Sequence, residues 1–310
     1  MNGIVVIDKP PGKTSYDVIR DVKRLVKVRK IGHTGTLDPL ATGVLPLCIN
    51  EATKLVRFFS NDDKTYRATM LLGVETETLD IEGTVTVSNP VTVEVGDIEN
   101  VAGEFVGEIE QTPPRYSAIK FKGKPLYKWA RNGTPIDPAP RKVTIYGITI
   151  EDIALPYVTF EVSCSKGTYI RSLCADIGSR LGCGACMSGL RRKKSGYFGE
   201  KSALNLENLD DKRRLEMIKE SLIPMVDALP DYRSISVADE IAERIRKGYQ
   251  PDSETLGVNA IPSLDRGDII KLVTKGKKMV AVARMCRASR DASCSDDNGK
   301  IVEILRVFNN

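Results

Sequence analysis

The chain has 310 residues and a formal net charge of +5, and with 41% hydrophobic and 28% charged residues it has the composition of a soluble globular protein of about two domains. No stretch approaches the roughly 20 consecutive apolar residues that cross a bilayer, and residues 3–7 (GIVVI) resemble a strand more than a signal peptide. Seven cysteines, an odd number in a long chain, favour reduced thiols. We therefore expect a cytoplasmic protein with no membrane partner, and a monomer, because no long apolar surface stripe calls for obligate assembly.

After the first predicted strand, residues 8–15 (DKPPGKTS) imitate a phosphate-binding P-loop. A P-loop requires a glycine five residues before Gly12, where this sequence has Ile7, so we reject a nucleotide site. Thr14 and Asp17 instead have the spacing of a capping box and predict the start of an amphipathic helix. Its polar face is either a solvated surface or a second surface that contacts phosphates. That face carries six basic residues: Arg20, Lys23, Arg24, Lys27, Arg29 and Lys30.

Residues 32–46 (GHTGTLDPLATGVLP) have the composition of a loop, with three glycines, two prolines and three threonines. They nevertheless enclose one carboxylate, Asp38, among apolar side chains, and the only histidine of the chain, His33, lies five residues upstream. Asp38 is either the start of an Asx turn or a carboxylate held for chemistry. The histidine in the same loop favours the second interpretation.

A short helix is predicted from Glu51 to Phe59, and alternation predicts a strand from Tyr66 to Leu72. Tyr66 is either a core aromatic at the start of that strand or a residue of a site. A turn-rich segment then passes through Asp80 and returns as residues 84–87, which predicts that the two strands pair antiparallel around this bend.

Residues 115–142 contain eight basic residues against one acid, a net charge of +7, which leaves −2 for the rest of the chain. Tyr116, Phe121, Tyr127 and Trp129 alternate with these cations, and four prolines interrupt the segment. Cations that follow phosphates and aromatic rings that stack on unpaired bases suit folded or single-stranded RNA. A solvated basic loop is the alternative.

Two strands are predicted at residues 143–151 and 157–163, followed by a helix whose buried face includes Ile170, Leu173, Cys174 and Ile177. Arg171 lies in the first turn of this helix, beside the apolar stripe, so its guanidinium can turn inward toward a carboxylate.

Cys183 and Cys186 form a CxxC motif, but the chain has no second CxxC and no histidine nearby, so we predict no metal site. Residues 190–194 (LRRKK) are interpreted as basic surface, and a charged helix is predicted at residues 210–220.

A domain boundary is predicted near residues 229–231 (LPD). Ser236 and Asp239 then have capping-box spacing, and Gly248 is expected to end the helix. Short strands at residues 268–273, 279–284 and 301–305, with a polar loop at 291–299, predict a small β-barrel.

Five separated segments closely resemble, in order and spacing, the motifs of the TruB family of tRNA pseudouridine synthases: residues 8–10 (DKP), 32–46, 64–68 (KTYRA), 167–172 (GTYIRS) and 190–192 (LRR). The residues from about Asp231 resemble a PUA domain, so the likeness covers nearly the whole chain. It implies an α+β fold, with a mixed, largely antiparallel central sheet flanked by helices, and a small C-terminal β-barrel-like PUA domain. The catalytic domain would span residues 1–229 and the RNA-binding PUA domain residues 231–310.

The resemblance implies that uridine 55 in the tRNA T-loop is isomerised to pseudouridine, by breaking the glycosidic bond and rejoining uracil through carbon 5. No atoms are gained or lost, so no cofactor or metal is expected. Asp38 would be the nucleophile, Arg171 its ion-pair partner, and Tyr66 the ring that stacks on the target base and serves in proton transfer. His33 would fill the space left when that base flips out.

The resemblance also implies pocket positions for Lys9, Asp80, Tyr169 and Leu190. Residues 115–142 would be an RNA-clamping insertion that becomes ordered on binding, with Lys122, Lys124 and Lys128 contacting the RNA. The partner would be the T-stem-loop of tRNA, bound as in the bacterial enzymes, without a guide RNA.

Two other classes of function remain open from the residues alone. A non-catalytic RNA-binding protein or RNA chaperone would use the basic aromatic segment and the C-terminal domain without chemistry at Asp38. A zinc-dependent nucleobase enzyme would require stoichiometric metal.

Overall fold

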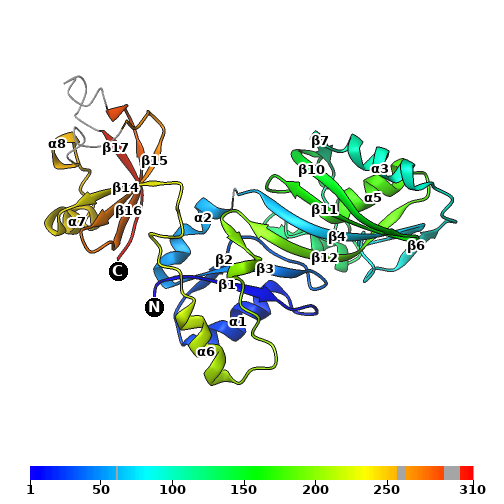
Figure 1. The fold of residues 1–310 in the computed structure, drawn as a ribbon, viewed down its shortest axis with the longest axis horizontal. Coiled ribbons are helices and arrows are strands. Elements are labelled where there is room, and N and C mark those ends of the chain that lie inside the picture. Colours follow the sequence, from blue (N-terminus) through cyan, green and yellow to red (C-terminus); the bar gives the residue numbers. More distant parts are fainter. Residues whose placement is uncertain (61, 257–262, 290–300, 310) are drawn as a thin grey trace.

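The computed structural model describes residues 1–60, 62–256, 263–289 and 301–309, and its largest element is a mixed sheet of nine strands (Figure 1). Seven strands follow one another across the sheet: β1 (Gly3–Lys9), β3 (Thr42–Ile49), β12 (Ala185–Ser195), β4 (Lys64–Leu72), β11 (Tyr157–Cys164), β10 (Arg141–Ala154) and β7 (Gly107–Gln111). β2 (Ile31–His33) pairs with β3, and β13 (Phe198–Gly199) pairs with β12. All pairs are antiparallel except β3 with β12, so the expected mixed, largely antiparallel sheet is confirmed.

Helices flank this sheet, as expected, and their apolar faces join one hydrophobic core with it. The larger ones are α1 (Ser15–Val26), α3 (Val95–Glu104), α5 (Ile170–Arg180) and α6 (Asp211–Glu220). The capping box predicted at Thr14 and Asp17 begins α1, and the buried face predicted for the helix after residue 169 is buried in α5. The helix predicted from Glu51 to Phe59 consists of a 3-10 turn, η1 (Asn50–Leu55), and one α-helical turn, α2 (Val56–Phe59).

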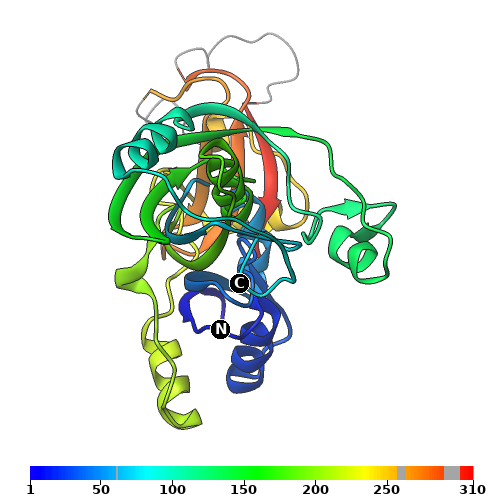
Figure 2. The ribbon, with the colours of Figure 1, turned by 90° about the vertical axis from the view of Figure 1, so that its right-hand side faces the viewer.

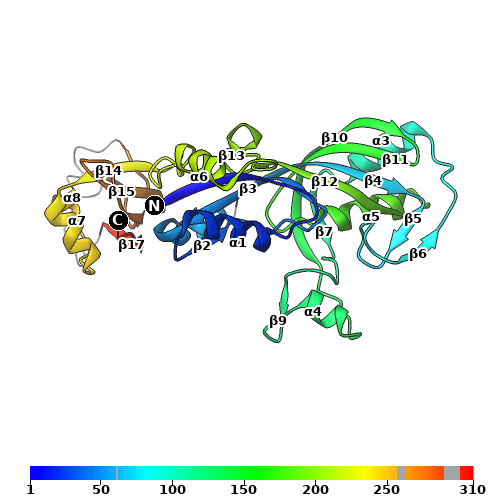
Figure 3. The ribbon, with the colours of Figure 1, turned by 90° about the horizontal axis from the view of Figure 1, so that it is seen from below.

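Two shorter pairs of strands lie outside the main sheet. β5 (Val74–Thr76) pairs antiparallel with β6 (Val85–Ser88), so the antiparallel pair predicted around the bend is confirmed, but its first strand is β5 and not the strand that begins near Tyr66. β4 instead lies between β11 and β12, because its alternating buried residues form part of the central core. β8 (Lys120–Phe121), β9 (Lys124–Pro125) and α4 (Leu126–Arg131) form the insertion, which projects from the body in Figures 2 and 3.

The C-terminal part contains a four-stranded sheet in the order β14 (Arg233–Val237), β15 (Ile269–Thr274), β16 (Met279–Met285) and β17 (Val302–Val307). In the described residues this sheet is not closed into the expected barrel. α7 (Asp239–Arg246) has Ala238 at its N-cap, so the capping box predicted at Ser236 is wrong: Ser236 belongs to β14, where its backbone pairs with β15. α8 (Ser253–Leu256) follows α7. The polar loop predicted at 291–299 lies outside the described residues. In the catalytic part of the chain, a short 3-10 helix, η2 (Glu200–Ser202), precedes α6.

The two sheets share a second hydrophobic core around β1. Val5 and Ile7 face the first core, whereas Ile4 and Val6 face the second, which includes Phe308 and other C-terminal residues. Lys271 of β15 adds a polar anchor, since its buried ammonium group donates hydrogen bonds to the carbonyl oxygens of Val226 and Leu229 at 2.9 and 2.7 Å. The C-terminal sheet is therefore packed against the strand that begins the chain.

The close packing of α5 on β12 can be tested at a helical glycine. A Cβ at Gly178 would lie 2.3 Å from the backbone nitrogen of Ala185, whereas a Cβ at Gly103 of α3 would meet nothing within 4 Å. We expect Gly178→Ala to lower the free energy of unfolding by about 1–3 kcal/mol because the helix must move away from the strand. The matched Gly103→Ala is expected to raise it by up to about 1 kcal/mol through helix propensity. Urea denaturation measures both, and equal effects would contradict this packing.

Candidate active site

Asp38 lies in the loop between β2 and β3, and side chains from elsewhere fix the backbone on both sides of it. The buried Ser15 hydroxyl accepts from the Leu37 N–H at 2.8 Å and donates to the Leu37 carbonyl at 3.0 Å. The Pro39 carbonyl accepts from the Gly12 N–H at 2.9 Å and from the Lys9 ammonium at 3.1 Å. The Asp38 side chain itself is 38% exposed, so a fixed backbone presents an accessible carboxylate.

The Asp38 carboxylate is bound by Arg171, as its place in the first turn of α5 led us to expect. Arg171 Nε lies 3.0 Å from Asp38 Oδ2, and Nη1 lies 3.5 Å from Asp80 Oδ2. Its Nη1 and Nη2 also donate to the carbonyl oxygens of Thr78 and Tyr116, both at 2.9 Å. The backbone turn is closed by the Ala41 N–H and the Asp38 carbonyl at 3.1 Å, so the Asx-turn alternative does not describe the side chain.

Asp80 is the second carboxylate that contacts Arg171, and unlike Asp38 it is buried. Its Oδ1 accepts from the Thr78 hydroxyl at 2.6 Å and from the Glu82 N–H at 3.2 Å, while Oδ2 faces Arg171. The turn predicted around Asp80 therefore supplies the second carboxylate of the site.

Tyr66 is buried in β4, directly opposite Arg192 of β12 in the strand pairing, so the two side chains lie on the same face of the sheet. Burial raises the pKa of Tyr66, so this phenol is protonated near neutral pH. The prediction that residues 190–194 are basic surface is wrong for Arg192, which is only 1% exposed. Arg191 is bound by Asp8 and Glu200, at 2.9 and 2.5 Å.

Tyr169 is the N-cap residue of α5, and a buried glutamine holds its backbone. The Gln111 side-chain oxygen accepts from the Tyr169 N–H at 2.8 Å, and its amide nitrogen donates to the Tyr169 carbonyl at 3.1 Å. The first turn of α5, which carries Arg171, is thus attached to the end of β7. Gln111, Ser15 and Arg192 were not identified from the sequence as residues of the site. Only Arg192 had a signal in the sequence, because it belongs to the LRR motif.

His33 and Leu190 are both half-buried next to the loop. His33 Nδ1 accepts from the Gly35 N–H at 3.2 Å, and burial together with Arg192 lowers the pKa of its imidazole, so the ring is neutral near pH 7. The Leu190 carbonyl accepts from the Thr42 hydroxyl at 3.4 Å.

Family models match most of the chain. Residues 23–170 match the TruB family pseudouridylate synthase N-terminal domain, and residues 171–229 match the tRNA pseudouridylate synthase B C-terminal domain. The tRNA pseudouridine synthase B of Syntrophus aciditrophicus is 55% identical over 308 residues, 99% of both chains. The chain belongs to the TruB family. Members of this family isomerise uridine to pseudouridine.

A second TruB relative, the tRNA pseudouridine synthase B of Clostridium kluyveri, is 43% identical over 91% of this chain and 95% of its own. Among solved structures, a chain of a Cbf5-Nop10-Gar1 complex matches with a TM-score of 0.74 and 29% identity, covering 99% of this chain and 85% of that one. These matches confirm the pseudouridine synthase fold. Neither family model extends beyond residue 229, so the PUA assignment of the C-terminal residues stays a prediction.

The insertion of this TruB chain presents its lysines on a projecting segment. Lys122, Lys124 and Lys128 are exposed on the hairpin and α4, which project from the body (Figure 3). The aromatic residues between them are partly used inside the insertion: the Phe121 and Trp129 rings meet edge to face with centroids 6.1 Å apart. The segment thus has a small structure of its own that presents cations.

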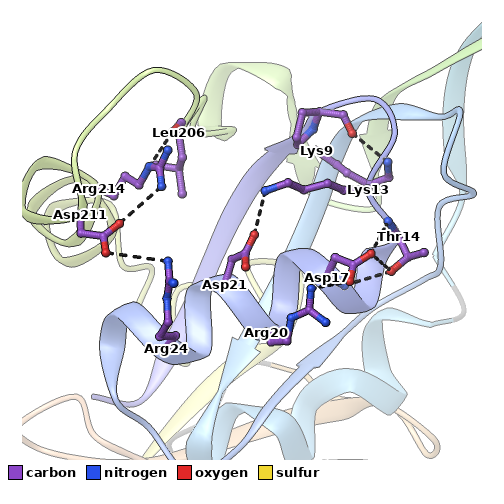
Figure 4. A network of polar contacts seen from close by, with 11 residues as sticks. Lys9, Lys13, Thr14, Asp17, Arg20, Asp21, Arg24, Leu206, Asp211 and Arg214 are labelled. Atoms are coloured by element: carbon purple, nitrogen blue, oxygen red, sulfur yellow. Dashed lines mark hydrogen bonds and ion pairs between the residues drawn. The ribbon is translucent and has the colours of Figure 1, made fainter.

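Two of the six cations predicted for this basic face, Arg20 and Arg24, are paired with acids, as is Lys13 just before α1 (Figure 4). Lys13 pairs with Asp21 at 2.8 Å and Arg20 with Asp17 at 2.9 Å. Arg24 Nη2 lies 3.8 Å from an Asp211 oxygen of α6. These ion pairs favour a solvated face at Arg20 and Arg24, and both interpretations stay predictions for the other four cations of the face.

The CxxC cysteines are buried, and burial raises the pKa of the Cys186 thiol to about 11. No group of three or more histidine, cysteine, aspartate or glutamate side chains that could hold a metal occurs in the described part of the chain. No helix there is long and apolar enough to span a membrane.

Lys9 gives the site a pH dependence that can be measured. The pKa of its ammonium group falls from 10.5 in an unfolded chain to about 8 in the folded protein. Burial lowers this pKa, and the negative charge of Asp38 only partly opposes the effect. Between pH 8 and 10.5 the unfolded state therefore holds more protons on Lys9, and stability rises with pH. We expect the free energy of unfolding of the wild type, relative to Lys9→Met, to increase across this window.

Urea titrations at several pH values measure this difference. Lys13→Met, which removes an exposed lysine from the loop that follows β1, is expected to keep the wild-type pH dependence. Parallel profiles for the wild type and Lys9→Met would contradict the assignment.

Proposed function

We propose that this enzyme converts uridine 55 in the T-loop of tRNA to pseudouridine, with Asp38 as the nucleophile. One observation carries the proposal: a carboxylate that is 38% exposed is held at 3.0 Å by a guanidinium that is 6% exposed. A nucleophile must reach its substrate and must also be oriented, and this pair provides both properties. The relatives named tRNA pseudouridine synthase B support the choice of substrate.

The chemistry requires only that one bond is exchanged for another. An Asp38 oxygen bonds to the nucleotide, and the glycosidic bond to nitrogen 1 of uracil breaks. The base turns and bonds to the ribose through carbon 5, carbon 5 loses its proton, nitrogen 1 gains one, and the bond to Asp38 is released. Atoms and electrons balance without a redox step, so the side chains described above suffice.

The target base must leave the RNA stack before Asp38 can reach it. Extruding a stacked base costs a few kcal/mol, which contacts in the pocket must recover. We assign the stacking surface, and a part in proton transfer, to Tyr66, and the space left in the T-loop to His33. Lys9, Asp80, Tyr169 and Leu190 would line or support the pocket.

RNA binding is assigned to the insertion and to the C-terminal domain at residues 231–310, proposed to be a PUA module. The insertion carries a net charge of +7, whereas the rest of the chain sums to −2, so the attraction for a polyanion is concentrated there. We propose that a monomer binds the T-stem-loop directly, without a guide RNA, because this insertion supplies a cationic surface of its own.

The nucleophile is tested by Asp38→Asn, which is nearly isosteric with the wild type. We expect pseudouridine formation on an unmodified T-stem-loop to fall by at least about 10³-fold while RNA binding is retained. Mass spectrometry and chemical mapping of the RNA measure the product and its position. Asp152→Asn, at an exposed position of β10, is the matched control with wild-type turnover. Wild-type turnover of Asp38→Asn would show that Asp38 is not the nucleophile, whereas no pseudouridine from the wild type would favour the RNA-binding protein without chemistry.

The insertion is tested by replacing Lys122, Lys124 and Lys128 with alanine. We expect weaker RNA binding and a shallower dependence on salt, by up to about one unit of slope for each lost phosphate contact. Titrations at several salt concentrations measure the slope. The control variant replaces three exposed lysines elsewhere, Lys201, Lys212 and Lys219, and removes the same charge. An equal effect of both triple variants would show that the insertion is only a solvated loop.

A further inference from the structure

Charge is also unevenly distributed outside the insertion. Residues 13–30 carry seven basic side chains and two acids, a net charge of +5. Together with the +7 of the insertion, this leaves a net charge of −7 for all other residues of the chain. Like charges gathered in one segment raise the local potential and attract a polyanion. Residues 13–30, which comprise α1 and the approach to β2, therefore form a second basic segment.

The two acids of this second basic segment already have partners. Asp17 pairs with Arg20 at 2.9 Å, and Asp21 pairs with Lys13 at 2.8 Å. Arg24 is paired with α6, as described above. The other four cations of the segment form no ion pair in the described part of the chain, and all four are exposed: Lys23, Lys27, Arg29 and Lys30. The structure thus leaves the charge of these four unpaired cations to solvent or to a partner.

An exposed aromatic ring lies on the same face of α1 as the first of these cations. The helix buries Ser15, Val18 and Val22 against the core. Tyr16 and Lys23 are seven residues apart, about two helical turns, so both lie on the opposite, solvent side. Tyr16 is 70% exposed. A ring that can stack on an unpaired base, followed by cations that can contact phosphates, is a combination suited to RNA.

α1 begins beside the proposed nucleophile and leads away from it. The hydroxyl of Ser15, the first residue of the helix, is hydrogen-bonded to both backbone groups of Leu37, which precedes Asp38. Lys23 follows eight residues later, about 12 Å further along the helix axis. In Figure 3, α1 and the insertion both lie below the strands of the main sheet. The four unpaired cations therefore face the side of the insertion, a few nucleotides away from a base bound at Asp38.

We propose that the four unpaired cations bind phosphates of the RNA stem that carries the target loop, and that Tyr16 stacks on an unpaired nucleotide of that loop. The inference rests on the proposed function, because it requires an RNA loop bound at Asp38. Contacts to phosphates carry no base information, but they fix the position and orientation of the RNA. α1 thus orients the stem from one side while the insertion attracts the RNA from another.

Two double variants of equal charge test the cations. Lys23→Gln with Lys27→Asn removes two unpaired cations, and asparagine tolerates the left-handed backbone of Lys27, whose φ is 50°. The control, Lys13→Gln with Arg24→Gln, removes two cations that are paired within the chain. We expect the first variant to weaken binding of T-stem-loop RNA about tenfold at low salt and to flatten the salt dependence by up to about two units of slope. The control is expected to keep the wild-type slope.

The binding and rate data separate this inference from the proposed function. The single-turnover rate at saturating RNA is expected to stay at the wild-type value in both double variants, because neither changes a residue of the site. A wild-type salt slope for Lys23→Gln with Lys27→Asn, or equal effects of the two double variants, would overturn the inference. Pseudouridine formation by the wild type would leave the proposed function standing in either case.

Two RNA hairpins show which part of the RNA the cations contact. One is the T-stem-loop with its full stem, and the other has the same loop on a shortened stem that is closed by a cross-link. We expect Lys23→Gln with Lys27→Asn to lose affinity for the full stem only, because the short hairpin lacks the phosphates in question. An equal loss on both hairpins would overturn the assignment to the stem.

The stacking role is tested separately with Tyr16→Ala and Tyr16→Phe. We expect the alanine variant to bind the T-stem-loop about tenfold more weakly with an unchanged salt slope, because the ring carries no charge. The phenylalanine variant keeps the ring and is expected to keep the wild-type Kd. Tyr197→Ala, which removes another exposed tyrosine, is the matched control. A wild-type Kd for Tyr16→Ala, or an equal loss for Tyr197→Ala, would overturn the stacking role.

Discussion

The site depends on one buried guanidinium. Arg171 joins four segments that are far apart in the sequence: the loop of Asp38, the turn that contains Thr78 and Asp80, the base of the insertion at Tyr116, and the first turn of α5. Removing it would leave the carboxylate of Asp80 buried without its cation, a change that is destabilising by about 3–5 kcal/mol in comparable buried pairs. Arg171 is therefore required both for the orientation of Asp38 and for the walls around it.

Polar side chains, and not regular secondary structure, make the surroundings of Asp38 rigid. The loop between β2 and β3 has no continuous partner strand, so its backbone groups need other partners. Ser15 supplies both partners for Leu37, Lys9 binds Pro39, and Gln111 plays the corresponding part for the first turn of α5. Each of these side chains is buried, where an unmatched polar group would be costly, so each also specifies one arrangement of the loop.

The sequence predicts local features of this site better than its contacts. The capping box at Thr14, the alternation of β4 and the apolar stripe of α5 follow from short-range patterns and are confirmed. The predictions for Arg192 and Ser236 are wrong for the same reason. The neighbouring residues suggest exposed basic surface at Arg192 and the start of a helix at Ser236, but both residues belong to strands that pair in a sheet. Pairing joins residues such as 66 and 192 that no periodicity connects. The motif resemblance identified the region of Arg192, but its burial follows only from the fold.

The base of the insertion is hydrogen-bonded to the guanidinium that binds Asp38. The Tyr116 carbonyl at its base accepts from Arg171 at 2.9 Å, and one residue further the Ser117 carbonyl accepts from the Tyr127 N–H of α4 at 3.1 Å. Two consecutive residues, Tyr116 and Ser117, thus connect Arg171, which binds Asp38, to the helix of the insertion. The net positive charge of the chain is concentrated in this projecting segment, so the surface proposed to bind RNA belongs to an element whose anchor is Arg171. The same guanidinium therefore links the proposed RNA-binding surface to the proposed nucleophile.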